Sequence, residues 1–271
     1  MTENANKIYK KSDITAALTA MGAPRGVVVV HSSLRSVGRV EGGGEGLLDA
    51  LIEYFTAEGG VLAIPTHTWH RLGEDITLDM KDGKTALGVL SDLAALDSRG
   101  VRSENPTHSV ALFGDRKKIA ELIRDEARLS TPTAENGFWG RLYTEGGQVL
   151  LIGVGLEKNT YFHAVEEILN IPNRMGEKPL PVAVRHKDGS VTRSSLRLYD
   201  ADFSDDVSHR FPKFEEALRY HRAISDGYIG NAYSRIVSCK RSLEVLRLVY
   251  SRAESDPLAD EVPIDPRTYV I

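Results

Sequence analysis

Two continuous apolar runs separated by a helical segment constrain the fold of this chain most strongly. Val27 to Val30 and Val61 to Pro65 are the short apolar runs expected of strands that are covered on both faces of a sheet. Between them, residues 46–57 place five large apolar side chains on one helical face, and Glu58-Gly59-Gly60 ends the helix. A strand, a helix and a second strand joined in this way are typical of an α/β protein.

The same alternation predicts the rest of the fold. A first helix is expected at residues 11–21 with Ser12 as its N-cap, and segments 88–96, 109–113, 116–128 and 148–154 read as helix, strand, helix and strand. Residues 181–199 predict an antiparallel hairpin around the Asp188-Gly189 turn, and residues 213–253 show helical periodicity. We therefore expect one α/β domain over residues 1–271, with a central mixed sheet flanked by helices, an antiparallel hairpin addition and C-terminal helices. Its core spans about residues 8–253, and residues 254–271 form an extended tail on the surface.

Composition limits the class of protein. With 271 residues, 41% of them hydrophobic, the chain is large enough for one substantial core. Its apolar runs are far shorter than the ~20 residues that cross a bilayer, and the N-terminus has no apolar signal segment, so we expect a soluble, cytoplasmic protein without a membrane partner. A net charge of -4 argues against nucleic acid as a partner and suits a cationic small molecule.

The single cysteine, Cys239, excludes an internal disulfide framework and a cysteine-rich metal site. It stands in a helical pattern, where a small buried thiol is the simplest interpretation, so we assign it no chemistry.

Polar residues and glycines follow the first apolar strand. His31, Ser32 and Ser33 come directly after the valine run, and Gly42 to Gly46 precedes the next helix. Free backbone N–H groups at a helix start attract anions, which favours a phosphate or pyrophosphate here. The run is neither a Walker loop nor a dinucleotide fingerprint in its usual place, and the alternative is an ordinary glycine turn.

A second polar cluster follows the strand at 148–154. His163 stands where a histidine can act as a general base, and Glu166 or Glu167 could orient it. A histidine that only hydrogen-bonds the helix start is the alternative. Because His31, His67 and His108 also lie near strand ends, a zinc site is a further possibility, although no His-x-x-x-His spacing supports it.

Six short motifs occur in sequence from about residue 8 to 253. They are His31 to Leu34 with Gly38 and the glycine-rich turn, Pro65 to Thr68, Arg102-Ser103 with Asn105 to Ser109, Val149 to Gly155, Asn159-Thr160 with His163 and Glu166, and Gly230 to Ala232 at the expected start of the last helix. On these motifs the chain resembles the aminoglycoside 3-N-acetyltransferases, the antibiotic N-acetyltransferase family that differs in fold from the GNAT acetyltransferases.

This resemblance implies an acetyl-CoA-dependent enzyme of the antibiotic-resistance type, which acetylates the 3-amino group of aminoglycosides in a ternary complex and needs no metal. His163 would be the general base, oriented by Glu166, because an aliphatic amine with a pKa near ~10 is protonated at neutral pH. Backbone amides near Ser32 and Ser33, or the Thr66 hydroxyl, would stabilise the oxyanion. The residues implied to bind acetyl-CoA are His31, Ser32, Ser33, Leu34, Arg35, Gly38, Gly43, Gly44, Thr66 and Ser109.

The chain departs from the family pattern at three places. Gly137-Phe138-Trp139 replaces a Ser-Pro-aromatic step, and Asn105 stands where histidine is frequent. The segment after Trp69 is also shorter than the insertion that shapes the acceptor pocket in resistance-type members. The candidate substrate-binding residues are Trp69, Glu74, Asp75 and Asp79, whose acidic members would attract a polyamine or form a solvated loop.

Other functions stay open at this point. They are acyl transfer to a different amine, such as a sugar nucleotide or a biosynthetic intermediate, a metal-dependent hydrolase that uses the four histidines, and a CoA-binding module without turnover. A monomer and a homodimer are equally compatible with the sequence.

Overall fold

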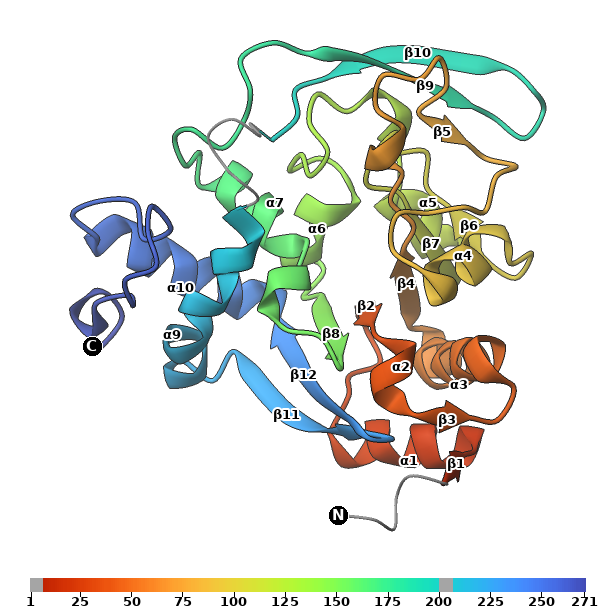
Figure 1. Ribbon diagram of the computed structural model, residues 1–271, viewed down its shortest axis with the longest axis horizontal. Helices are drawn as coiled ribbons and strands as arrows, with labels where there is room; N and C mark the ends of the chain where they lie inside the picture. The colour runs from red at the N-terminus through yellow and green to blue at the C-terminus, as the bar shows by residue number, and fades with distance from the viewer. Residues whose placement is uncertain (1–6, 200–206) are drawn as a thin grey trace.

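A seven-stranded mixed sheet forms the centre of the computed structural model, which describes residues 7–199 and 207–271. Its strand order is β11-β12-β8-β2-β4-β7-β6, and the three central strands β8, β2 and β4 run parallel (Figure 1). β12 pairs antiparallel with β8, and β7 pairs antiparallel with β4. The strands are β2 (Val27–Ser32), β4 (Val61–Pro65), β6 (Val101–Arg102), β7 (Val110–Gly114), β8 (Gln148–Ile152), β11 (Ile224–Ile229) and β12 (Ala232–Ser238).

Helices cover both faces of this sheet. Successive valines of β2 alternate between two cores, with Val27 and Val29 in one and Val28 and Val30 in the other. In Figure 1, α6, α7, α9 and α10 lie to the upper left of the sheet, and α1 and α3 lie to its lower right. The helices are α1 (Lys11–Ala20), α2 (Leu34–Val37), α3 (Gly43–Thr56), α4 (Val89–Leu96), α5 (Arg116–Leu122), α6 (Phe138–Thr144), α7 (Tyr161–Ile168), α9 (Glu215–Tyr220) and α10 (Cys239–Arg252).

Two smaller sheets complete the fold. β9 (Leu180–Arg185) and β10 (Val191–Leu196) form the expected antiparallel hairpin, and β5 (Leu78–Asp79) joins β9 in parallel at the top of Figure 1. Gly189 has the positive φ that the predicted turn requires. Near the N-terminus, β1 (Ile8–Tyr9) pairs with β3 (Arg39–Val40). The predicted α/β class, with a mixed sheet and a hairpin addition, is confirmed.

Several predicted boundaries are wrong. α1 begins after Lys10, whose backbone N–H donates to the Asp13 carboxylate at 2.8 Å, so Ser12 lies inside the helix and is not its N-cap. α3 begins at Gly43, before the predicted start at Gly46. α5 ends at Leu122 because the chain leaves helical geometry before Asp125, which has a φ of 63°, and a separate 3-10 turn follows.

The prediction of continuous helix over residues 213–253 is also wrong. Only α9 and α10 are helical there, and β11 and β12 lie between them. Gly230 and Asn231 form the turn between these strands and do not open the last helix. A Cβ on Gly230 would lie 2.5 Å from the Val37 carbonyl oxygen, so this turn packs closely on the end of α2. α10 begins at the buried Cys239, with the Ser238 hydroxyl accepting from the Arg241 N–H.

The C-terminal tail contributes to the core as well as the surface. The C-terminal residues Leu258, Ile264 and Tyr269 are buried in the hydrophobic core that includes residues of α6, α7, α9 and α10. The expectation of a tail that only wraps the surface is therefore incomplete.

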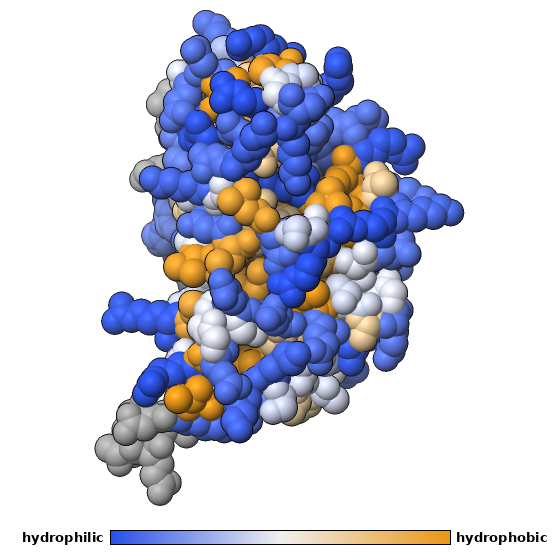
Figure 2. All heavy atoms as spheres, turned by 90° about the vertical axis from the view of Figure 1, so that its right-hand side faces the viewer, coloured by the Kyte–Doolittle hydropathy of each residue, from blue (hydrophilic) through white to orange (hydrophobic). Residues whose placement is uncertain are grey.

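The exposed surface carries apolar side chains on one face. Figure 2 shows apolar atoms across the middle of the face that contains α3 and α4. In the sequence of α4 and just before it, Leu87, Val89 and Leu96 are exposed. Among the described residues, no helix has the length and apolar character needed to cross a membrane.

Candidate active site

Four histidines that are far apart in the sequence meet beyond the carboxyl ends of the central strands. His31 is the penultimate residue of β2, His67 follows β4, and His163 lies in the first turn of α7 after β8. Because parallel strands end at one edge of a sheet, these positions share that edge, which is the usual ligand site of an α/β protein.

Ring contacts join these histidines into one cluster. The His67 and His108 ring centroids are 4.6 Å apart, and His67 also contacts the edge of Trp139 at 5.8 Å. Trp139 lies 6.3 Å from His31. Tyr199 connects the other side, 6.0 Å from His108 and 4.2 Å from His163. We refer to the set as the histidine cluster: His31, His67, His108, Trp139, His163 and Tyr199.

His163 and Glu166 form a pair within this cluster. They are three residues apart on α7, which brings them to the same helical face. His163 Nδ1 lies 3.4 Å from Glu166 Oε2, and both atoms are buried. The Glu166 side chain is fully buried, whereas that of His163 is 15% exposed. The geometry therefore pairs one ring nitrogen with a carboxylate and leaves part of the imidazole accessible.

The second oxygen of Glu166 is held from the opposite side. Arg174 Nε donates to Glu166 Oε1 at 2.6 Å, and the Tyr250 hydroxyl donates to the same oxygen at 3.2 Å. Arg174 is itself buried. Glu166, which is removed from water, therefore has a cation and a hydroxyl to compensate its charge.

Glu167 has a different environment from Glu166. Its carboxylate accepts from the Thr131 and Thr133 hydroxyls, and from the Tyr199 hydroxyl at 3.1 Å. Glu167 thus anchors the ring that stacks on His163 and does not face His163 itself. Sequence reasoning left the choice between these two glutamates open and missed Tyr199, because nothing in the local pattern around residue 199 signals a site.

The remaining cluster histidines are neutral at ordinary pH. Burial lowers the pKa of His31 to about 3, and the nearby Lys158 charge contributes to the same shift. Burial, with a smaller effect of His163, lowers the pKa of His108 to about 3. The pKa of His67 is held well below its usual range by burial and by the neighbouring histidines. These three rings therefore contribute ring contacts to the cluster without adding charge.

The described residues offer no group of three or more His, Cys, Asp or Glu side chains arranged to hold a metal ion. His67 and His108 contact each other through their rings, whereas His31 contacts the Trp139 ring and His163 contacts the Tyr199 ring. A hydrolase that uses these residues as zinc ligands thus has no geometric support in this part of the chain.

The residues expected to stabilise an oxyanion are largely engaged within the fold. The Thr66 hydroxyl is wholly buried, 2.9 Å from the Ser109 hydroxyl, and accepts from Arg102 Nε at 3.2 Å. The Ser33 N–H donates to the Ile152 carbonyl at 2.9 Å. Thr66, Ser109 and the Ser33 amide therefore stabilise this edge of the sheet, and their expected contacts with acetyl-CoA and with an oxyanion stay predictions.

The glycines of the predicted anion site have distinct surroundings. A Cβ on Gly44 would lie 2.9 Å from Leu93 and 3.2 Å from Val89, so this glycine allows α4 to pack on the start of α3. A Cβ on Gly38 would meet the Asn231 amide at 2.7 Å. Only Gly43, which has nothing within 4 Å, leaves open space at the helix start.

Other predicted binding residues lie close to this helix start. The Ser33 hydroxyl accepts from the Ser36 N–H and begins α2, which carries Leu34 and the exposed Arg35. The Leu34 side chain lies beside Gly44, 3.5 Å from where a Cβ on that glycine would stand. The α2 segment and the start of α3 thus adjoin the end of β2, where Ser32 and His31 lie.

The predicted acceptor residues stand on a separate segment. Trp69 is half-exposed and packs edge-on against His70. Glu74 is paired with Arg71 at 3.0 Å, and Asp79 is paired with Arg185 at 2.9 Å, whereas Asp75 is exposed. Two of the three acidic side chains already have an arginine partner, which reduces the negative charge available to a polyamine.

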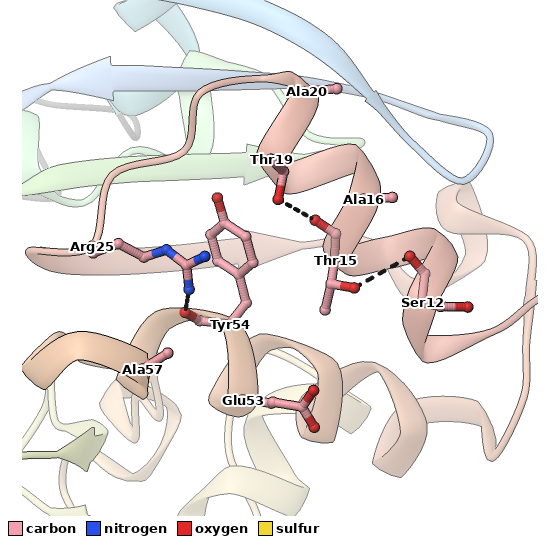
Figure 3. Close-up of a pocket in the computed structure, with 9 residues that line it drawn as sticks. All are labelled: Ser12, Thr15, Ala16, Thr19, Ala20, Arg25, Glu53, Tyr54 and Ala57. Carbon is pink, nitrogen blue, oxygen red and sulfur yellow. Dashed lines mark hydrogen bonds between the residues drawn. The ribbon is translucent and has the colours of Figure 1, made fainter.

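A hollow of about 600 Å³ between α1 and α3 is remote from this chemistry. Arg25 lies over the Tyr54 ring, 3.7 Å from its centroid, and donates to the Tyr54 carbonyl (Figure 3). The other side chains that line it are mostly short, and no cluster residue takes part. Convergence of polar groups, and not cavity size, therefore identifies the candidate site.

Comparisons with known proteins find relatives over most of the chain. The family profile described as aminoglycoside 3-N-acetyltransferase matches residues 29–250. Aminoglycoside N(3)-acetyltransferase IV of Salmonella sp is 29% identical over 253 residues, which cover 92% of this chain and 89% of that protein. The prophage-derived aminoglycoside N(3')-acetyltransferase-like protein YokD of Bacillus subtilis (strain 168) is 25% identical, with 86% and 89% covered.

Solved structures show the same fold. A mutant of aminoglycoside acetyltransferase AAC(3)-IVa in complex with a gentamicin is 26% identical, with a TM-score of 0.75 that covers 94% of this chain and 92% of that chain. AAC-IIIb, solved as a binary complex with CoASH, has a TM-score of 0.74 at 21% identity, covering 93% of this chain and 100% of that chain. Since the family profile spans most of its length, this chain belongs to the aminoglycoside 3-N-acetyltransferase family.

Proposed function

We propose that this enzyme transfers the acetyl group of acetyl-CoA to the 3-amino group of an aminoglycoside, with His163 as the general base. The observation that carries the proposal is the His163–Glu166 pair, in which His163 Nδ1 is buried beside the carboxylate while the His163 side chain is 15% exposed. Family membership and the gentamicin-bound relative support the acceptor class. The CoASH-bound relative supports the donor.

The reaction needs a base because the acceptor amine reaches the site largely as an ammonium ion. The ammonium ion first loses one proton to solvent, and the nitrogen of the neutral amine then attacks the thioester carbonyl. As the C–N bond forms, this nitrogen becomes positively charged again, and His163 accepts its second proton. The C–S bond then breaks, CoA leaves as the thiolate, and the imidazolium returns the proton to that thiolate or to solvent.

Glu166 assists this step in two ways. Its carboxylate faces Nδ1, which favours the tautomer that carries the Nδ1 proton and exposes the basic Nε2. It also stabilises the imidazolium that forms when the proton is transferred. No covalent acyl-enzyme is required, and Cys239, buried with a pKa raised well above its ordinary value by burial, is unsuited to act as a nucleophile.

The start of α3 and the adjoining α2 segment would hold the CoA phosphates. Gly43 leaves open space at the N-terminal end of a 14-residue helix, where backbone N–H groups and the helix dipole favour an anion. A pantetheine arm that follows the end of β2 from this helix start towards His163 would pass Ser32 and His31.

Acetylation of a different amine is the second candidate. It is favoured by one observation, that Glu74 and Asp79 on the predicted acceptor segment are already paired with arginines. A weakly acidic pocket would suit an amine with fewer positive charges.

An acceptor panel tests the proposal. The purified protein is given acetyl-CoA with gentamicin, tobramycin, kanamycin or neomycin, and in parallel with amino sugars, and CoA release is followed with a thiol reagent. Mass spectrometry and NMR then locate the acetyl group. CoA release with a product acetylated at the 3-amino group supports the proposal, whereas release only with other amines supports the second candidate. No release with any aminoglycoside overturns the aminoglycoside assignment.

A further inference from the structure

A row of alternating charges extends from His163 into the C-terminal tail. Glu166 accepts from Arg174 through one oxygen and faces His163 with the other. On its far side, Arg174 contacts Asp256 twice, at 2.8 Å from Nη1 to Oδ2 and at 2.9 Å from Nη2 to Oδ1. Asp256 lies beyond the end of α10, 82 residues after Arg174. The tail therefore contacts the arginine that holds Glu166 of the pair that we propose to perform proton transfer.

We propose that Arg174 and Asp256 are positioning residues for the general base: Arg174 fixes one Glu166 oxygen so that the other faces His163, and Asp256 sets how strongly the Arg174 charge acts on this pair. The inference rests on the proposed function, in which His163 accepts the amine proton.

The geometry of the guanidinium supports this role. Arg174 presents a planar fork of donors, of which Nε binds Glu166 and both Nη groups bind Asp256. A side chain held at both ends in this way has little freedom to rotate. Since Glu166 is fully buried, its orientation depends on these contacts and on the Tyr250 hydroxyl.

Burial makes the charges in this row act on one another strongly. Burial opposes ionisation of Asp256, but its hydrogen bonds from Arg174 and from the Leu258 N–H hold its pKa below the ordinary value. Burial likewise disfavours the Arg174 charge, and the hydrogen bond with Asp256 together with the Glu166 charge outweighs this and raises the pKa of Arg174. Arg174 and Asp256 therefore stay ionised over the working pH range.

Other groups also face the pair and must be kept constant in a test. Tyr199 stacks on His163 from the segment after β10, and the uncharged ring of Phe211 contacts His163 edge-on. His67 and His108 interact electrostatically with His163.

Further groups lie at the other end of the row. Tyr250 of α10 contacts both Glu166 and Arg174, and the charge of Lys213 acts on Asp256. None of these residues is altered by a substitution at Asp256.

The sharpest test is Asp256→Asn, which removes one negative charge and keeps the shape of the side chain. Without it, the Arg174 charge acts more strongly on His163 and disfavours the imidazolium. We expect the midpoint of the acidic limb of the kcat/KM profile to move to lower pH by roughly half a unit or more. The KM for acetyl-CoA should not change, because Asp256 contacts Arg174 and is separated from His163 by Arg174 and Glu166.

Asp260→Asn is the matched control. Asp260 lies on the same tail and is paired with a lysine, Lys213, but its side chain is 65% exposed. Its profile should coincide with that of the unmodified protein. A third variant, Arg174→Lys, keeps the charge but loses the planar fork, so kcat should fall about tenfold or more while the KM for acetyl-CoA is retained.

An NMR titration of the His163 ring in the unmodified and Asp256→Asn proteins provides a readout that does not need turnover. A lower titration midpoint in the variant supports the inference even if no aminoglycoside is acetylated, in which case only the proposed function fails. Unchanged midpoints in both the NMR titration and the rate profile, with the variant folded by circular dichroism, would overturn it. So would Arg174→Lys with an unchanged kcat.

Discussion

Glu126 gives a quantitative test of the buried electrostatics that support α6. Its carboxylate is buried, with Oε1 accepting from the Phe138 N–H at 2.6 Å and Oε2 lying 3.4 Å from the Ser103 hydroxyl. This contact caps the first residue of α6, the helix that carries Trp139 into the histidine cluster. Burial raises the pKa of Glu126 to about 7, against the opposing effect of the hydrogen bond from Phe138.

The shift makes stability depend on pH in a defined direction. The folded state holds the Glu126 proton more tightly than the unfolded state, so the free energy of unfolding falls as pH rises from about 4.5 to about 7 and is level above that range. At ~1.4 kcal/mol per pH unit, the rise from 4.5 to about 7 corresponds to about 3 kcal/mol. The full cost of ionising this group is thus present at pH 8 and absent at low pH.

Glu126→Gln removes the titration and keeps an oxygen that can accept from the Phe138 N–H. Urea unfolding at several pH values between 5 and 8 should show the variant gaining stability relative to the unmodified protein as pH rises, by up to about 3 kcal/mol. Glu121→Gln, on the exposed side of α5, serves as the control and should follow the unmodified protein. If the difference between Glu126→Gln and the unmodified protein were the same at pH 5 and pH 8, the reasoning would be refuted.

Two further predictions concern the His163–Glu166 pair and the start of α3. Glu166→Gln should shift the acidic limb of the kcat/KM profile to lower pH by about 1–3 units, because the carboxylate 3.4 Å from His163 Nδ1 is lost. The control Glu167→Gln should leave this limb nearly in place. Equal shifts in both variants would contradict the assignment of Glu166 as the partner of His163. Gly46→Ala should lower the free energy of unfolding by roughly 1–3 kcal/mol, since its Cβ would lie 1.8 Å from the Glu41 carbonyl oxygen. Chemical denaturation measures this change. Gly26→Ala is the control, because a Cβ on Gly26 would have no atom within 4 Å.

The fold could be predicted from the sequence wherever the buried residues of an element follow one another in a simple, regular pattern. β2 and β4 are buried along their length and are therefore continuous apolar runs, which predicted them with the helix between them. β11 and β12 were missed. In β12, Ala232, Ser234 and Ile236 are buried at alternate positions, but the polar residues between them also fit a helical repeat. This segment forms a strand because it pairs with β8, which is far away in the sequence.

The candidate site was readable only in part, for a similar reason. His31, His67 and His163 follow predicted strands, so their convergence could be expected from the topology of an α/β sheet. The partners of Glu166 could not be found in this way. Arg174, Tyr250 and Asp256 stand on three separate segments of the chain, and only tertiary packing brings them to one carboxylate.

Replacement of His163 tests the central claim most directly. His163→Ala and the unmodified protein are compared side by side for CoA release with acetyl-CoA and gentamicin, while acetyl-CoA binding is measured by calorimetry. Loss of the general base should lower turnover by about 10²-fold or more with acetyl-CoA affinity retained. Turnover of His163→Ala at the unmodified rate would show that the histidine is structural and would contradict the account.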